Sequence, residues 1–213
     1  MKRTAVDDAE RKLSPQETLR LIEQQGSAAA NRLTPDPVPH YLAWGVAWLV
    51  GYSAMFLHHG LSGTPYAPIP FPAVLALLFG SMSAAMLVSV LTIWQPGSPV
   101  RGVSQQRGTM YGLAWFLGSL AVWVAGIRFA PQLPSAEGSL LWASLSMTVV
   151  AVLYMAGGAI WLLRSMFVFG AGLAVLNAIG TAAGPGWHAL LMSLGAGGGS
   201  IAAGLVLRRS AGR

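Results

Sequence analysis

The sequence predicts an all-α, polytopic membrane protein. We expect a bundle of six transmembrane helices with both termini in the cytoplasm, preceded by a short amphipathic cytoplasmic helix. Charged residues make up only 9% of the 213 residues and mean hydropathy is +0.56, whereas soluble domains carry about 25% charge. Apolar stretches of spanning length recur along the chain, and lysine and arginine gather in the segments of one predicted side.

Residues 1–40 form a polar tail that holds six of the seven acidic residues. The tail lacks the apolar run of a signal peptide, so we expect it to remain in the cytoplasm. Ser14-Pro15-Gln16-Glu17 fits a capping box with proline at the first helical position and predicts a helix over about 15–33. The prolines of residues 34–39 then end the helix in an extended linker.

One face of this tail helix carries the apolar residues Leu19, Ile22 and Leu33. We interpret them as a candidate binding face for a cytoplasmic protein partner. Two alternatives stay open. The helix could lie on the lipid headgroups, although its mixed charge disfavours this, or the tail could be a solvated segment without a partner.

Six apolar segments follow, at about 41–57, 71–94, 109–127, 139–162, 166–183 and 187–207. Residues 139–183 form one stretch that only Arg164 interrupts. As a single helix this stretch would be roughly 67 Å long, more than twice the hydrocarbon thickness of about 30 Å. It must therefore reverse, and Arg164 is the natural place. The alternative is an earlier break at Gly157-Gly158.

The positions of the cations predict the orientation. With the N-terminus inside, twelve of the thirteen lysine and arginine residues fall in cytoplasmic segments, including the basic end 208–213, and only Arg128 falls on the other side. The positive-inside rule therefore favours cytoplasmic positions for both termini. The cations form no basic helix or stripe, so we expect no nucleic-acid partner.

Several classes of chemistry are disfavoured. Without cysteine the chain can form no disulfide, thiolate metal site or cysteine nucleophile. We expect no Asp, Glu, Lys or His deep in a span, whereas ion-coupled transporters and intramembrane hydrolases need such groups. We therefore predict no catalytic residue, no metal and no cofactor. His58, His59 and His188, on the external side, could hold a metal, but an interfacial position at helix ends is favoured.

Three residues are candidates for lining a solute path: Asn177, Trp48 and Trp123. Asn177 is the only amide within a predicted span, and the two tryptophans lie deeper than the six predicted near the interfaces. The alternatives are an interhelical hydrogen bond for Asn177 and core packing for the tryptophans.

Small residues mark candidate helix-packing surfaces. Gly195 and Gly199 form a small-xxx-small pattern on the last helix, and Gly80 with Ser83 offers a similar surface on the second. Such a surface could join copies of the chain into a homo-oligomer or pack within its own bundle.

The first quarter of the chain resembles the start of uncharacterised actinobacterial multi-pass integral membrane proteins. The resemblance rests on Ser14-Pro15-Gln16-Glu17-Thr18-Leu19-Arg20-Leu21-Ile22-Glu23, Leu33-Thr34-Pro35-Asp36-Pro37 and Trp44-Gly45-Val46-Ala47-Trp48-Leu49-Val50-Gly51. It implies a tail-plus-bundle layout in a bacterial plasma membrane and brings no known activity or catalytic residue.

Two functional hypotheses follow. The first is a non-enzymatic membrane subunit or regulator that engages a cytoplasmic partner through its N-terminal helix. The second is a small permease or facilitator for an apolar or neutral solute, which needs no coupling ion.

Overall fold

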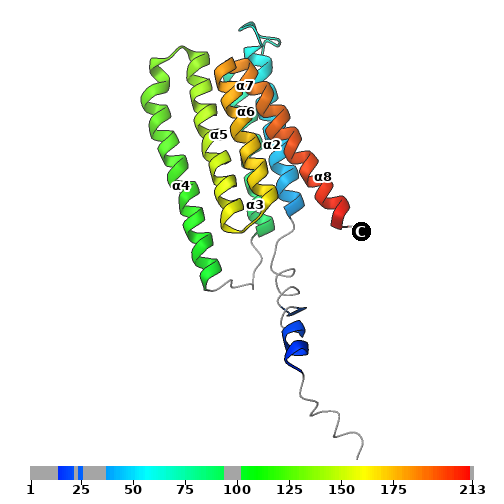
Figure 1. The fold of residues 1–213 in the computed structure, drawn as a ribbon. Helices are drawn as coiled ribbons and strands as arrows, with labels where there is room; N and C mark the ends of the chain where they lie inside the picture. Colours follow the sequence, from blue (N-terminus) through cyan, green and yellow to red (C-terminus); the bar gives the residue numbers. More distant parts are fainter. Residues whose placement is uncertain (1–13, 22–23, 26–36, 94–101, 212–213) are drawn as a thin grey trace, which may run out of the picture. The chain divides into compact units, whose positions relative to one another are not determined.

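The computed structural model describes residues 14–21, 24–25, 37–93 and 102–211. The chain divides into two units, Met1–Asp36 and Pro37–Arg213. In the first unit, residues 15–21 and 24–25 are helical. The described part of the second unit consists of helices and their connections without a strand (Figure 1), which confirms the all-α prediction.

The second unit contains α2 (Pro37–His59), α3 (Phe71–Ile93) and α4 (Val103–Phe129), which continues into the 3-10 helix η2 (Ala130–Gln132). Then come α5 (Ser135–Ile160) and α6 (Arg164–Ala183). The last part runs from α7 (Pro185–Met192) through the π-helix η3 (Ser193–Gly198) into α8 (Gly199–Ala211).

Five helical stretches in the described part of the chain are long and apolar enough to cross a membrane: Phe71–Thr92, Val103–Gln132, Ser135–Ile160, Arg164–Ala183 and Pro185–Arg209. They correspond to five of the six predicted segments and support a multi-pass membrane protein. The helix at Val103–Gln132 begins six residues before the predicted 109–127. The polar residues of its first turns still form helix, because polar side chains are favourable at a helix end outside the hydrocarbon.

The remaining predicted segment, 41–57, falls on α2, which has 23 residues but is not among these five. Its tryptophan, tyrosine and histidine side chains lower the hydropathy of the helix. The position of α2 explains why it can carry them. It packs against α3 and also against α7, η3 and α8, so protein rather than lipid covers much of its surface.

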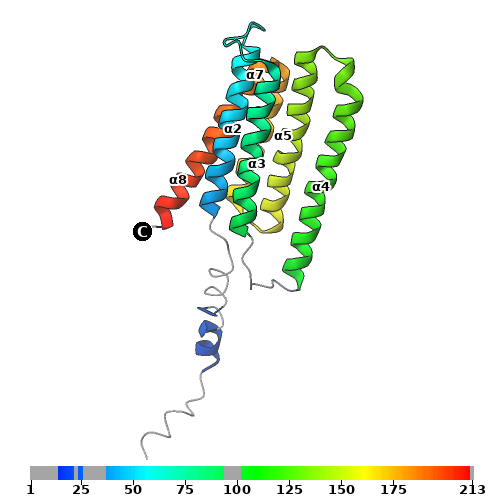
Figure 2. The same cartoon turned by 180° about the vertical axis from the view of Figure 1, so that it is seen from behind.

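Helices α2 to α6 run in alternating directions, and the α7–η3–α8 stretch continues in one direction, antiparallel to α6 (Figures 1 and 2). We call the end of the bundle where α2, α4 and α6 finish the His59 end, and the opposite end the Arg164 end. Arg107 and Arg164 lie in the first turns of α4 and α6, and Arg208 and Arg209 lie in the last turns of α8, all at the Arg164 end. Arg128 lies in the last turn of α4, at the His59 end.

The centre of the bundle is formed by α2, α5, α6 and the α7–η3–α8 stretch, whereas α3 packs mainly on α2 and α4 mainly on α5. The central helices meet in one cluster of buried residues: Trp48, Tyr52, Met147, Ala151, Leu173, Met192 and Ala196. The structure therefore contains a protein-lined core to which two outer helices attach.

The reversal between α5 and α6 occurs at residues 161–163, just before the predicted Arg164, and the alternative break at Gly157-Gly158 is wrong because α5 continues to Ile160. Leu162 takes a left-handed conformation with φ 55°, and the Leu163 N–H donates to the Gly158 carbonyl at 2.8 Å. This is a Schellman-type cap with leucine at the position that glycine usually fills. Without a glycine there, the sequence carried no turn residue that marks Leu162, although Arg164 predicted the region of the reversal.

Candidate functional site

His188, one turn into α7 and only 1% exposed, is among the most enclosed polar side chains of the described residues. Helix α7 begins at Pro185, immediately after the turn residue Gly184. The adjacent helix α6 makes room for the histidine through Gly180, where a Cβ would lie 2.7 Å from the His188 Cα. His188 therefore lies inside the protein, between α7 and α6, and not on its surface. Among the described residues it is the only buried histidine or charged side chain.

A hydrogen-bond network connects His188 to two other helices. Its Nε2 lies 2.7 Å from Asn177 Oδ1 on α6. Asn177 Nδ2 donates to the Ser144 carbonyl at 3.0 Å and to Thr148 Oγ1 at 2.9 Å, both on α5. Because Nδ2 is occupied as a donor, Oδ1 must accept, and His188 Nε2 therefore carries the hydrogen. The side chain of Asn177 joins α5, α6 and α7.

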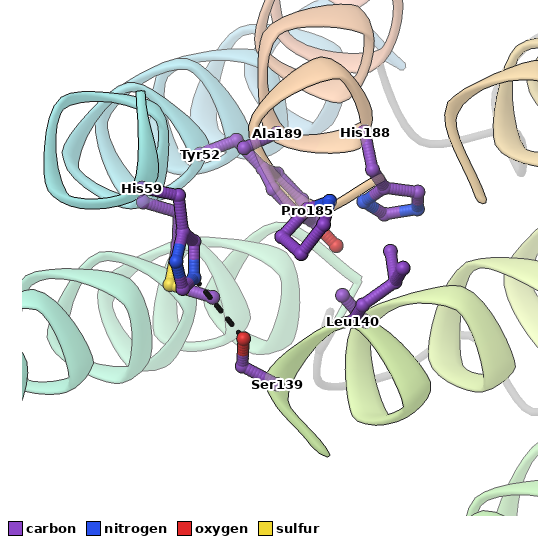
Figure 3. Close-up of a pocket in the computed structure, with 9 residues that line it drawn as sticks. Tyr52, His59, Ser139, Leu140, Pro185, His188 and Ala189 are labelled. Atoms are coloured by element: carbon purple, nitrogen blue, oxygen red, sulfur yellow. Dashed lines mark hydrogen bonds between the residues drawn. The ribbon is translucent and has the colours of Figure 1, made fainter. Parts of the chain in front are cut away.

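Next to His188 lies a small cavity at the His59 end (Figure 3). Its volume is about 10 Å³, close to the minimum that admits one water molecule. The lining residues come from α2, α5 and α7: Tyr52, Met55, His59, Ser139, Leu140, Ala143, Pro185, His188 and Ala189. The cavity thus combines apolar walls with two imidazoles and two hydroxyl groups.

His59 and Ser139 form a second polar pair at this cavity, with Nε2 and Oγ 3.1 Å apart (Figure 3). That distance would suit a base and a nucleophile. However, the Ser139 hydroxyl donates to the Ala136 carbonyl at 2.7 Å, so the geometry makes Ser139 the acceptor and His59 the donor. A water-sized cavity also leaves no room for an ester or peptide substrate in this conformation.

The three histidines predicted to lie on the external side point to different partners. His58 Nδ1 lies 2.9 Å from the Ile69 carbonyl in the α2–α3 connection, while His59 faces Ser139 and His188 faces Asn177. Within the described ranges, no group of three or more His, Cys, Asp or Glu residues could hold a metal ion. The residues present therefore offer no convergent ligand set.

The three candidate solute-path residues lie in different surroundings. Asn177 sits in the network with His188, and Trp48 is buried in the central cluster. Trp123 is 58% exposed on α4, where its ring packs edge-to-face against Trp142. Trp123 therefore lies apart from Asn177 and Trp48, and the three residues do not line a common cavity in the described part of the chain.

The glycines and serine singled out for helix packing also lie in different surroundings. A Cβ on Gly195 would collide with Leu176 of α6, whereas Gly199 has only an ordinary contact of 3.6 Å with Phe169. Gly80 has nothing within 4 Å of its Cβ position, and Ser83 is exposed on the outer face of α3.

Another glycine, Gly197 of η3, makes a close backbone contact with α2. A Cβ there would lie 2.6 Å from the Leu49 nitrogen of α2, and a Cβ on Gly45 would lie 3.0 Å from the Gly197 carbonyl oxygen. Two glycines on opposite helices therefore allow α2 and η3 to touch backbone to backbone.

In the N-terminal unit the predicted capping box is formed. The Glu17 N–H donates to Ser14 Oγ at 3.2 Å, and the Ser14 N–H donates to the Glu17 carboxylate at 2.9 Å. The hydrogen bond from the Ser14 backbone, and then that of its side chain, hold the pKa of Glu17 below its ordinary value. Leu19 is 61% exposed; Ile22 and Leu33, the other members of the predicted face, lie outside the described residues.

Sequence reasoning underestimated His188. A signal was present, because Gly184-Pro185 marks a helix start and places His188 within the first turns of the last helix. The preceding helix ends at the same turn, so Asn177 and His188, seven residues before and four after Gly184, lie near the same level of an antiparallel hairpin. No protein-family model matches the chain, and neither curated proteins nor solved structures include a significant match.

Proposed function

We propose that this chain is a non-enzymatic membrane subunit or regulator that engages a cytoplasmic partner through its N-terminal helix. The observation that carries this proposal is the capped helix in a unit separate from the bundle, with Leu19 61% exposed. A formed cap reduces the number of conformations that a partner must order on binding. An exposed leucine beside it offers the apolar anchor that helix-in-groove recognition uses.

The proposed orientation has six spans, with α2 as the first, and places the Arg164 end in the cytoplasm of a bacterial plasma membrane. Support comes from the distribution of arginines between the two ends of the described bundle and from the positive-inside rule. Because the chain has no cysteine, single cysteines can test the orientation. In intact cells an impermeant maleimide should label Ser62→Cys and spare Gln105→Cys, two exposed positions at opposite ends. The reverse pattern would refute this orientation.

The partner is tested by native mass spectrometry of the chain released gently from its own membrane. A second polypeptide in fixed stoichiometry is the expected result. Leu19→Ser should then reduce its retention, whereas Leu21→Ser should not, because position 21 lies about 200° around the helix from position 19. Both variants keep the capping box. Equal retention by wild type and Leu19→Ser would refute the assigned face, and a lone monomer or a homo-oligomer would refute the subunit role.

A second candidate function is a permease or facilitator for a small neutral solute. The observation that favours it is the series of polar groups that leads into the bundle from the His59 end: His59 with Ser139, the cavity, then His188, Asn177 and Thr148. Solute flux into proteoliposomes should fall in Asn177→Leu if these groups line a path. Flux that is unchanged in this variant would rule out a path along them.

A further inference from the structure

The hairpin between α6 and α7 is closed by a single residue, Gly184, with φ 105°. The Gly184 N–H donates to the Gly180 carbonyl at 3.0 Å, and the His188 N–H donates to the Gly184 carbonyl at 2.9 Å. Beyond these backbone bonds, the hydrogen bond between His188 and Asn177 is the polar contact that attaches the first turns of α7 to the neighbouring helix. The His188 side chain therefore holds the first turns of α7 against α6 through this hydrogen bond.

The orientation of the His188 ring determines where a proton could add. Its Nε2 faces Asn177, and its Cδ2 lies 3.2 Å from the Cβ position of Gly180. Both atoms thus lie against α6, so the opposite edge, which carries Nδ1, faces away from α6. Since Nε2 holds the hydrogen of the neutral ring, Nδ1 is the free acceptor. His188 also lines the cavity.

The groups around His188 suit a neutral ring and not a charged one. The titratable groups that face it come from α2: Tyr52, whose ring centroid lies 6.1 Å away, and His59 across the cavity. The nearby residues of α5 and α6 are Ser139, Leu140, Asn177 and Gly180, which carry no charge. No carboxylate lines the cavity. A buried imidazolium would lack a counter-ion, and an unpaired buried charge is costly.

We propose that His188 is a proton-binding latch at the His59 end of the bundle. Neutral His188 fastens α7 to α6, and through Asn177 to α5. Protonation favours a conformation in which the ring reaches water, so the first turns of α7 separate from α5 and α6 and the small cavity opens. A lower pH on the side of the His59 end would thus give water access to the interior of the bundle. This inference does not depend on the partner proposed for the N-terminal helix.

A cysteine reporter tests the latch in the full chain reconstituted in nanodiscs. Ala189 neighbours His188, lines the cavity and is 2% exposed, so Ala189→Cys should react with a water-soluble maleimide only when the cavity opens. Ser62→Cys, which is always exposed, gives the reference rate at each pH and corrects for the pH dependence of the thiol itself. The measured quantity is the ratio of the two rates between pH 8 and pH 5.

An exposed imidazole has an ordinary pKa of about 6.5, so the ratio should rise by up to about tenfold for each pH unit below that value. Adding His188→Gln should make the ratio independent of pH, whereas His59→Gln should leave the rise in place. If the ratio does not change with pH in Ala189→Cys with the native His188, the proposal is overturned. A rise abolished by His59→Gln but kept in His188→Gln would assign the proton to His59 and overturn it equally.

One further variant covers the case in which His188→Gln does not fold. Asn177→Asp places a carboxylate beside the ring, and a protonated His188 would then have a counter-ion. In this background the cavity should stay closed at pH 5, with a ratio near its pH 8 value. Opening with the same pH dependence as Ala189→Cys alone would show that the charge of His188 does not drive the change.

Discussion

The last helical stretch, α7–η3–α8, and α4 have similar lengths and hydropathy but different surroundings. Each is a glycine-containing apolar run long enough to cross a membrane. Yet 33% of the residues in the most apolar 18-residue segment of Pro185–Arg209 are buried within the protein, against 11% in that of Val103–Gln132. The first stretch packs against α2 and α6, whereas α4 packs mainly against α5.

The difference lies in what each glycine meets. Gly197 meets the backbone of α2, where Gly45 provides the matching space. The glycines of α4 meet only side chains of α5 (Gly118 and Gly126) or nothing within 4 Å of their Cβ positions (Gly108 and Gly112). Helices in a bilayer gain no hydrophobic driving force from each other and associate through close van der Waals contact and hydrogen bonds. A glycine therefore promotes packing only when the opposite helix also permits close approach.

The largest expected effect on stability is a difference between alanine substitutions at two adjacent glycines of η3, Gly197 and Gly198. Gly197→Ala would place a Cβ 2.6 Å from the Leu49 nitrogen and force α2 and η3 apart, whereas Gly198→Ala meets nothing within 4 Å. We expect Gly197→Ala to lower stability by about 2 kcal/mol or more, roughly 5 to 10 °C in Tm. Gly198→Ala should be neutral or slightly stabilising. Thermal unfolding in detergent measures both, and equal Tm values would contradict the α2–η3 contact.

The next largest effect concerns the hydrogen bonds of Asn177 that connect α7 to α6 and α5. Asn177→Leu would leave the His188 Nε2–H without its acceptor and remove both bonds to α5. We expect a loss of about 1–2 kcal/mol, because a buried donor is left unpaired. Thr148→Val is the matched control, since Asn177 then keeps its bond to the Ser144 carbonyl, and it should cost less. A Thr148→Val loss as large as that of Asn177→Leu would contradict this order.

Gly112→Ala tests the other side of the comparison. The residue is exposed on α4 with open space at its Cβ position, so the substitution should raise the stability of the monomer by up to about 1 kcal/mol through helix propensity. The Tm checks this, and native mass spectrometry reports the oligomeric state in parallel. A clear loss of Tm together with a change in oligomeric state would mean that α4 packs against a second copy of the chain.

The smallest expected effect lies in the capping box of the N-terminal unit. The pKa of Glu17 lies below its ordinary value of 4.5 when the capping box is formed. The carboxylate therefore stabilises the helix above that value, and the contribution disappears as the pH falls through the lowered pKa. Circular dichroism of residues 1–36 should show helicity falling slightly between about pH 5 and pH 3. Ser14→Ala should lower helicity at neutral pH but only reduce this pH dependence, because the Glu17 carboxylate keeps its bond from the backbone N–H of residue 14. Glu17→Gln should remove the contribution of this carboxylate altogether.

Much of the fold was predictable because the membrane constrains single segments. Twenty apolar residues in a row have few alternatives to a spanning helix, and five predicted segments coincide with such helices. The boundaries of α4 and the turn at Leu162 were less predictable. Polar residues can extend a helix beyond the hydrocarbon, and a leucine can occupy a left-handed cap when the surrounding structure requires it.

The candidate site was predictable only in part. The sequence singles out Asn177, because an amide inside a spanning helix needs a hydrogen-bond partner. It does not identify that partner, and it predicts an interfacial position for His188. The burial of His188 depends on Gly180 beside it and on α2 and α5 across the cavity, and contacts between distant segments leave no local pattern in the chain.

The residue pattern alone was enough to predict the helical, apolar segments of the chain, the capping box at Ser14 and the division of arginines between helix ends. These follow from the local physics of burial in lipid, capping and charge. The folded chain was needed to show which glycines bring backbones together, that Trp123 lies on the outer face, and that His188 bonds to Asn177 beside a water-sized cavity. Such features depend on which side chains meet across helices, and nearly uniform apolar segments do not specify their partners.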